Sequence, residues 1–149
     1  MNRRHRLLAL TSAALLLLGL SGQVLAAPPP AGPSYSATMT ADRKCNLVVS
    51  VTWKNDPAVA KLYVSFWEAG YNNPNLAVPE FVVAYEWPTT SPNTGVLKGK
   101  VVTFTFGPVT KDTASHNWWA FVDFYTADGV GITQLMPTLT TNCYFPSPA

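Results

Sequence analysis

Large apolar residues recur at every second position in four separate stretches of the chain. The clearest is 47–54, where Leu, Val, Val and Trp at the odd positions alternate with smaller or more polar residues. The same two-residue period recurs at 62–67, 101–106 and 118–125. Side chains of a β-strand point alternately to the two faces of its sheet, so this period predicts strands. β-Branched and aromatic residues, which favour strands, dominate all four stretches.

Seven strands are predicted in total. We place them near residues 35–41, 46–54, 61–68, 80–87, 99–107, 117–126 and 132–142. Turn-forming residues separate them, among them Asn55-Asp56-Pro57 and Asp128-Gly129. No stretch of ten or more residues after the N-terminal segment carries a helical apolar stripe. Seven short strands in about 115 residues are typical of an antiparallel β-sandwich.

Short motifs resemble fibronectin type III and related immunoglobulin-like domains. The segment 47–53, LVVSVTW, followed by Pro57, is similar to the second strand of such a domain, which commonly ends in a core Trp before a Pro-containing turn. Residues 118–129 resemble the sixth strand and its following turn, and Thr138-Leu139-Thr140-Thr141 resembles the closing strand. The resemblance covers most of residues 35–142. It implies an all-β, seven-stranded antiparallel immunoglobulin-like sandwich.

The only two cysteines of the chain are Cys45 and Cys143. Cys45 precedes the second predicted strand and Cys143 follows the seventh. In the sandwich that the resemblance implies, these two points lie at the same pole, so a disulfide is expected across 98 positions of sequence. Closing such a loop stabilises a fold by about 4–5 kcal/mol on the chain-entropy model, less any strain. The alternative is two isolated buried thiols.

Residues 1–26 have the pattern of a secretory signal peptide. Three arginines lie within the first six residues, an apolar run follows from Leu7 to Leu20, and Val24-Leu25-Ala26 fits a cleavage site. The run of 14 residues is shorter than the roughly 20 that a membrane helix needs, so no stable membrane insertion is expected after cleavage. The mature protein is then secreted or periplasmic, where an even pair of cysteines favours a disulfide.

The rest of the chain is expected to form one domain. Residues 27–34 are a proline-rich leader, 35–145 the sandwich and 146–149 a short tail. Removing residues 1–26 takes away three of the ten basic residues and leaves a net charge of −1. A near-neutral domain with few charges has no electrostatic footprint for nucleic acid, and nothing steers it toward anionic lipid.

No catalytic motif is apparent around the single mature histidine. His116 lies in Thr113-Ala114-Ser115-His116-Asn117, which we interpret as a solvated polar turn before a strand. No nucleophile elbow surrounds any serine of the chain. The histidine and the two cysteines are also too few for a typical zinc site.

The acidic residues give only weak candidates. Glu68, Glu86 and Asp123 lie on predicted strands, and a close approach of Glu68 to Glu86 is the arrangement that would suit paired-carboxylate hydrolysis. We expect them instead to be solvated residues at strand ends. Asp112 and Asp128 lack the spacing of a dense calcium loop. The sequence therefore predicts no enzyme activity, no metal and no cofactor.

The informative anomaly is a second set of aromatic residues. If the even positions 118–124 face the core, the odd positions of the same strand face outward, and the same argument applies to 62–67. These two strands are sheet neighbours in an immunoglobulin-like sandwich. The residues expected on their shared outer face are Tyr63, Trp67, Trp119, Phe121 and Tyr125. Even half exposed, they make a patch of several hundred Å², because each aromatic side chain offers about 150–250 Å².

Three interpretations of this face are open. The Pro-rich leader or the connections 69–80 and 87–99 cover it, a protein partner binds it, or it stacks sugar rings. A register error of one residue would exchange the inner and outer sets. We predict an exported, non-catalytic binding or adhesion module that presents the face to a protein partner. The alternatives are a carbohydrate-binding module and a small secreted hydrolase or hydrolase inhibitor.

Overall fold

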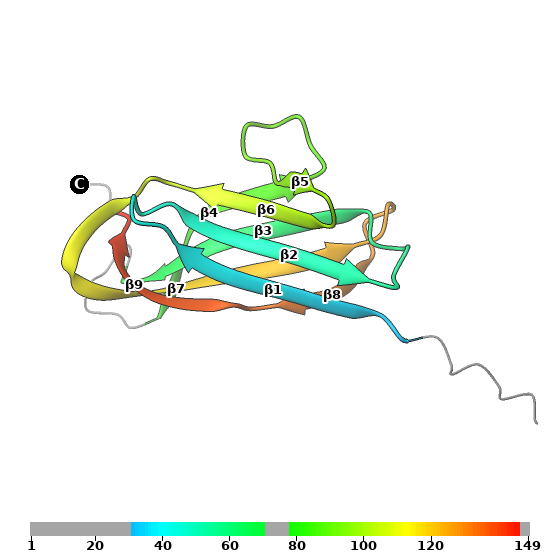
Figure 1. Ribbon diagram of the computed structural model, residues 1–149, viewed down its shortest axis with the longest axis horizontal. Helices are drawn as coiled ribbons and strands as arrows, with labels where there is room; N and C mark the ends of the chain where they lie inside the picture. The colour runs from blue at the N-terminus through cyan, green and yellow to red at the C-terminus, as the bar shows by residue number, and fades with distance from the viewer. Residues whose placement is uncertain (1–30, 71–77, 147–149) are drawn as a thin grey trace, which may run out of the picture. The chain divides into compact units, whose positions relative to one another are not determined.

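The computed structural model describes residues 31–70 and 78–146. The expected signal peptide at 1–26, the first half of the leader and three of the four residues of the expected tail lie outside the described residues. The described chain forms two antiparallel sheets in a sandwich-like fold (Figure 1). Its strands are β1 (Ser34–Ala41), β2 (Leu47–Lys54), β3 (Lys61–Ala69), β4 (Pro79–Trp87), β5 (Val96–Lys98), β6 (Val101–Phe106), β7 (Thr110–Tyr125), β8 (Gly131–Leu135) and β9 (Thr138–Tyr144). Within these residues no helix is long and apolar enough to cross a membrane.

The two sheets divide the strands unevenly. The four-stranded sheet has the order β1-β2-β6-β5, and the five-stranded sheet has the order β4-β3-β7-β8, with β9 also paired to β7. Strand β7 is 16 residues long, and it pairs with β3 along one edge and with both β8 and β9 along the other. It is therefore the central strand of the larger sheet, and it carries three of the five predicted face residues.

The core lies between the sheets and consists of the residues that the two-residue period selects. The fully buried side chains are Leu47, Val49, Val51, Val102 and Phe104 from the smaller sheet, and Leu62, Val64, Phe66, Trp118, Ala120, Val122 and Phe124 from the larger. Each set alternates with more exposed neighbours along its strand, as the pleat requires, except that Ser65, between Val64 and Phe66, is also buried. The predicted register is confirmed.

The number of strands differs from the seven predicted. Strand β5 is only three residues long, which is too short for a period to show. The predicted strand 132–142 is two strands, because Met136 and Pro137 separate β8 from β9 and proline cannot donate to a ladder. Strand β7 begins at Thr110, seven residues before the predicted start. Its first eight residues are mostly polar and exposed, so they show no alternation of apolar and polar positions.

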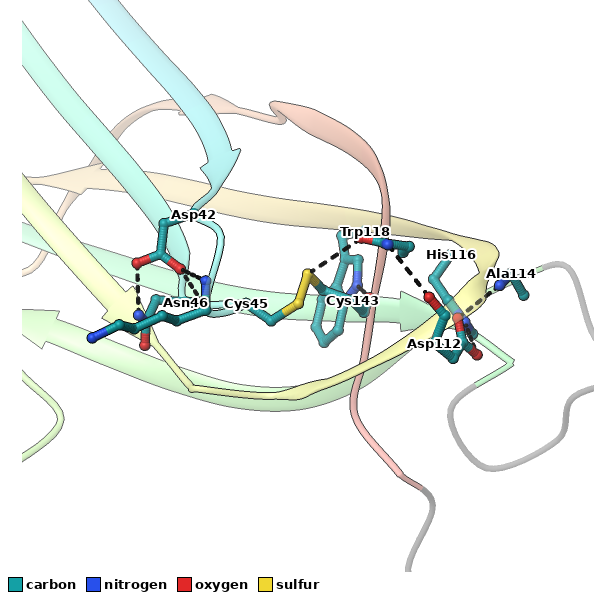
Figure 2. Close-up of a disulfide and its surroundings, with 10 residues drawn as sticks. Asp42, Cys45, Asn46, Asp112, Ala114, His116, Trp118 and Cys143 are labelled. Atoms are coloured by element: carbon teal, nitrogen blue, oxygen red, sulfur yellow. Dashed lines mark hydrogen bonds and ion pairs between the residues drawn. A yellow bond between two sulfur atoms is a disulfide. The ribbon is translucent and has the colours of Figure 1, made fainter.

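The predicted disulfide joins Cys45 to Cys143, with the two Cα atoms 5.5 Å apart (Figure 2). Cys45 precedes β2 and adopts a positive φ of 60°, and Cys143 lies near the end of β9. Both cysteines are buried. The bridge links the two sheets at one end of the sandwich, which we call the disulfide pole.

Candidate functional site

The five predicted face residues all lie on the outer side of the larger sheet. Tyr63, Trp67, Trp119, Phe121 and Tyr125 are each partly exposed, while their chain neighbours on β3 and β7 are buried. Trp67 lies directly across from Trp119, and Phe121 lies across from Ser65. The five residues therefore share one face of the sheet, and on that face Trp67 and Phe121 are in ring contact.

One end of the face is an aromatic cluster, which we define as Trp67, Phe81, Trp119 and Phe121. The Trp67 ring lies 5.5 Å from Phe121 and 5.5 Å from Phe81, with the ring planes inclined by 71° and 75°. These are edge-to-face contacts, a favourable geometry for aromatic pairs. Trp67 is the centre of the cluster, and Phe81, at its rim, is 47% exposed.

Phe81 is the member that the sequence did not indicate. Phe81, Val83 and Tyr85 are alternate residues, so a regular strand would place all three on the same face. A bulge in the pairing of β3 with β4 breaks this relationship: Phe66 pairs with Val83, but the next residue, Trp67, pairs with Phe81. The residue between them is extra, so Phe81 points outward with Trp67 while Val83 packs on the core. A two-residue period cannot reveal such an insertion.

The other end of the face holds the two tyrosines. Tyr63 precedes Trp67 by four residues on β3, which corresponds to about 13 Å along the strand. Tyr63 pairs with Asp123, and Asp123 accepts a hydrogen bond from the Gln134 amide. Tyr63 therefore lies in a cross-strand row with two carboxylates, Glu86 and Asp123, and not with another aromatic ring. Tyr63 and Tyr125 instead help to line a pocket of about 460 Å³ beside Lys61 and Glu86.

The indole N–H of Trp67 is already used within the face. It donates to the Ser65 hydroxyl at 2.8 Å. Ser65 is buried although it lies on the outer side of the sheet. The indole is therefore fixed in orientation, and what it offers to a ligand is its apolar surface.

A second cluster, which we call the acid–histidine cluster, comprises Glu68, Asp112 and His116. His116 Nδ1 lies 3.4 Å from Glu68 Oε1, and Nε2 lies 3.0 Å from Asp112 Oδ2. The imidazole stacks on the Tyr144 ring at 5.0 Å with an 18° interplanar angle. The expectation of a solvated turn histidine is therefore wrong: His116 belongs to β7, and its side chain is only 22% exposed.

Glu68 is the most buried charged residue among those described, at 2% exposure. Its Oε2 accepts the backbone N–H of Phe145 at 3.0 Å. Burial raises the pKa of Glu68 to about 7, against the opposing effects of the Phe145 hydrogen bond and the charge of His116. The carboxylate thus ties β3 to β7 and to the residue that follows β9.

The chemistry available to the acid–histidine cluster is limited. Both ring nitrogens of His116 are directed at carboxylates, so neither activates a nucleophile in this arrangement. In the part of the chain that the structure describes, no group of three or more His, Cys, Asp or Glu residues could hold a metal ion. The cluster is an electrostatic tie between β3 and β7.

The other acidic candidates lie apart. Glu68 pairs with Glu80 at one end of β4, whereas Glu86 pairs with Tyr63 at the other end, so the two carboxylates do not form a hydrolytic pair. Asp112 lies near the start of β7, whereas Asp128 lies beyond its end. Asp128 accepts a hydrogen bond from the Thr126 hydroxyl within the turn before β8.

Comparison with known proteins adds no relative to this description: no protein-family model matches the chain, and no curated protein matches it.

Proposed function

We propose that this protein is an exported binding module of the immunoglobulin-like class, and that its aromatic cluster binds a protein partner. The observation that carries this proposal is the position of Phe81. A large apolar side chain is 47% exposed and stands against Trp67, at the rim of a cluster built from three strands. Aromatic anchors that are grouped and held rigid are characteristic of protein–protein contact surfaces.

The ring geometry favours a protein over a sugar. A pyranose stacks on a flat aromatic surface, but the rings of Phe81 and Phe121 are inclined by more than 70° to Trp67. The indole N–H, a useful donor to sugar hydroxyls, is bonded to Ser65. An uneven apolar surface of this kind suits the side chains of a complementary protein.

The strand order supports the immunoglobulin-like assignment. Such domains place their first, second, fifth and fourth strands in one sheet and the third, sixth and seventh in the other. In the smaller sheet, the order β1-β2-β6-β5 would correspond to the first, second, fifth and fourth strands of such a domain. The larger sheet follows it too, with β4 as an added edge strand and β8 and β9 as a divided closing strand.

Export is supported by the disulfide and by the N-terminal sequence. Disulfides persist in oxidising compartments, and Cys45 and Cys143 are bridged. The arginines and apolar run of residues 1–26 have the order of a signal peptide. The secreted or periplasmic protein would meet its partner outside the cytoplasm.

Site-specific photo-crosslinking in the producing cells tests the proposal. Phe81 is replaced by the photoreactive benzoylphenylalanine, and Thr38, exposed on the smaller sheet, is replaced in the same way as the control. We expect one discrete protein adduct from position 81 and none from position 38. The adduct should weaken when Phe121→Ser is added to the chain. Equal labelling from both positions, or an adduct that ignores position 121, contradicts the proposal.

A further inference from the structure

A small pocket lies at the end of the sandwich away from the disulfide. Strand β2 ends there with Trp53 and Lys54, β4 ends there with Trp87, and the turn between β5 and β6 supplies Gly99 and Lys100. The pocket has a volume of about 240 Å³ and is lined by Trp53, Trp87, Leu97, Gly99 and Lys100. We call it the Trp–Lys pocket. It lies at the edge of both sheets and is distinct from the aromatic cluster.

The indoles of Trp53 and Trp87 pack against the hydrophobic core. The Trp53 and Trp87 rings are 5.7 Å apart and inclined by 57°, and Trp53 also meets the buried Phe124 edge-to-face at 6.4 Å. Both tryptophans are partly exposed. Two aromatic walls fixed in place at the mouth of a pocket offer an apolar contact at small cost in side-chain ordering.

The charge of the pocket is positive. Lys100 is its only charged lining residue. A neighbouring pocket of about 440 Å³ shares Trp53 and Lys100 and adds Lys54 and Asp56. The Asp56 carboxylate already accepts hydrogen bonds from the Tyr35 hydroxyl and from the Ala58 N–H, the latter at 3.0 Å. Neither Lys54 nor Lys100 forms an ion pair within the part of the chain that the structure describes.

We propose that the Trp–Lys pocket binds an acidic sugar residue of a polysaccharide, with the apolar face of the ring on one indole, its edge against the other indole, and the acid group on the Lys100 ammonium. Lys54, across the adjoining pocket, receives the acid group of the next residue along the chain. The combination is selective because a small inorganic anion leaves the two indoles unused and a neutral sugar leaves the ammonium unused. This inference is independent of the proposed protein partner.

The overall charge makes the two lysines decisive. The chain after residue 26 has a net charge of −1, so no general attraction draws an anionic polymer to the protein. Binding must therefore come from local contacts at the Trp–Lys pocket. Since Lys54 and Lys100 are exposed at the surface, they can be replaced without disturbing the core.

The test is a titration of the purified protein with a galacturonic acid tetramer, followed by tryptophan fluorescence and by calorimetry. We expect saturable binding that changes the fluorescence and weakens with added salt. Lys100→Ala should lower the affinity about tenfold, as expected for loss of one charge-assisted contact. Lys111→Ala, which removes an exposed lysine near the disulfide pole, is the matched control and should leave the affinity unchanged.

Leu97 provides a second pair of variants that does not depend on the lysines. This half-exposed residue lines the pocket, so Leu97→Glu introduces a repelling charge and Leu97→Gln a neutral group of the same length. Binding should be lost with Glu and retained with Gln, while thermal unfolding shows both proteins folded. The proposal is overturned if the tetramer does not bind, if Lys100→Ala and Lys111→Ala behave alike, or if a neutral maltotetraose or a glutamate tetrapeptide binds equally well.

Discussion

Trp118 donates its indole N–H to the backbone carbonyl of Cys143 at 2.8 Å (Figure 2). The tryptophan is fully buried on β7, and its acceptor is a member of the disulfide. An indole N–H here bonds to the chain 25 residues away and joins β7 to β9 beside the covalent bridge.

Trp118→Phe keeps an aromatic ring but removes this donor. The Cys143 carbonyl is then left without its buried partner, and the smaller ring leaves a cavity. We expect the free energy of unfolding to fall by about 2–4 kcal/mol. Urea denaturation followed by circular dichroism measures the change. Trp119→Phe, one residue along and on the outer face, is the control and should cost less than about 1 kcal/mol.

Removal of the disulfide should be as costly as loss of a large core side chain. The bridge closes 98 residues of sequence, which on the chain-entropy model contributes about 4–5 kcal/mol. The Cys45→Ala, Cys143→Ala double variant is expected to lose most of this amount, which is a large share of the stability of a small domain. Equilibrium unfolding of both proteins without reductant gives the difference. Equal stability would show that the bridge constrains the unfolded chain far less than its length implies.

The residues that determine the core were predictable because burial is periodic in a strand. Leu47, Phe104 and Val122 alternate with polar or half-exposed neighbours, and a one-residue slip would put every one of them in water. The cysteine pairing followed from the strand order that the resemblance implied. In these cases local pattern and global fold agree.

The features that escaped prediction lack a local signal. Phe81 faces outward only because of a bulge against β3, and His116 is half-enclosed only because Glu68 and Tyr144 come to it from other strands. Likewise Trp53 and Trp87 are distant in sequence and meet where two strands end. A sequence read one strand at a time carries no information about such cross-strand neighbours.

Glu68 gives the fold a distinctive pH dependence. Its pKa rises from 4.5 to about 7 on folding because the carboxyl group is buried. A raised pKa means that the protonated group favours the native state. This contribution is full below pH 4.5 and is lost as the pH rises through about 7. At higher pH, the ionised Glu68 carboxylate should lower the free energy of unfolding by up to about 3 kcal/mol.

Glu68→Gln tests this prediction because it keeps an oxygen for the Phe145 N–H but does not ionise. Unfolding free energies of the two proteins are compared below pH 4.5 and above pH 7. We expect the unfolding free energy of the variant to increase relative to that of the wild type as the pH rises. A constant difference across the range would mean that His116 compensates the charge of Glu68 completely, and the raised pKa would then be wrong.

Phe81 and Phe66 should respond in opposite ways to truncation, although both are aromatic residues of the larger sheet. Phe66 is fully buried and contacts Tyr85 and Phe106, so Phe66→Ala is expected to cost about 3–5 kcal/mol. Phe81→Ser removes a side chain that is already half in water and should change stability by less than about 1 kcal/mol. If Phe81→Ser instead destabilised the fold as much as Phe66→Ala, the ring would be a structural element, and the protein-binding role proposed for the aromatic cluster would lose the observation on which it rests.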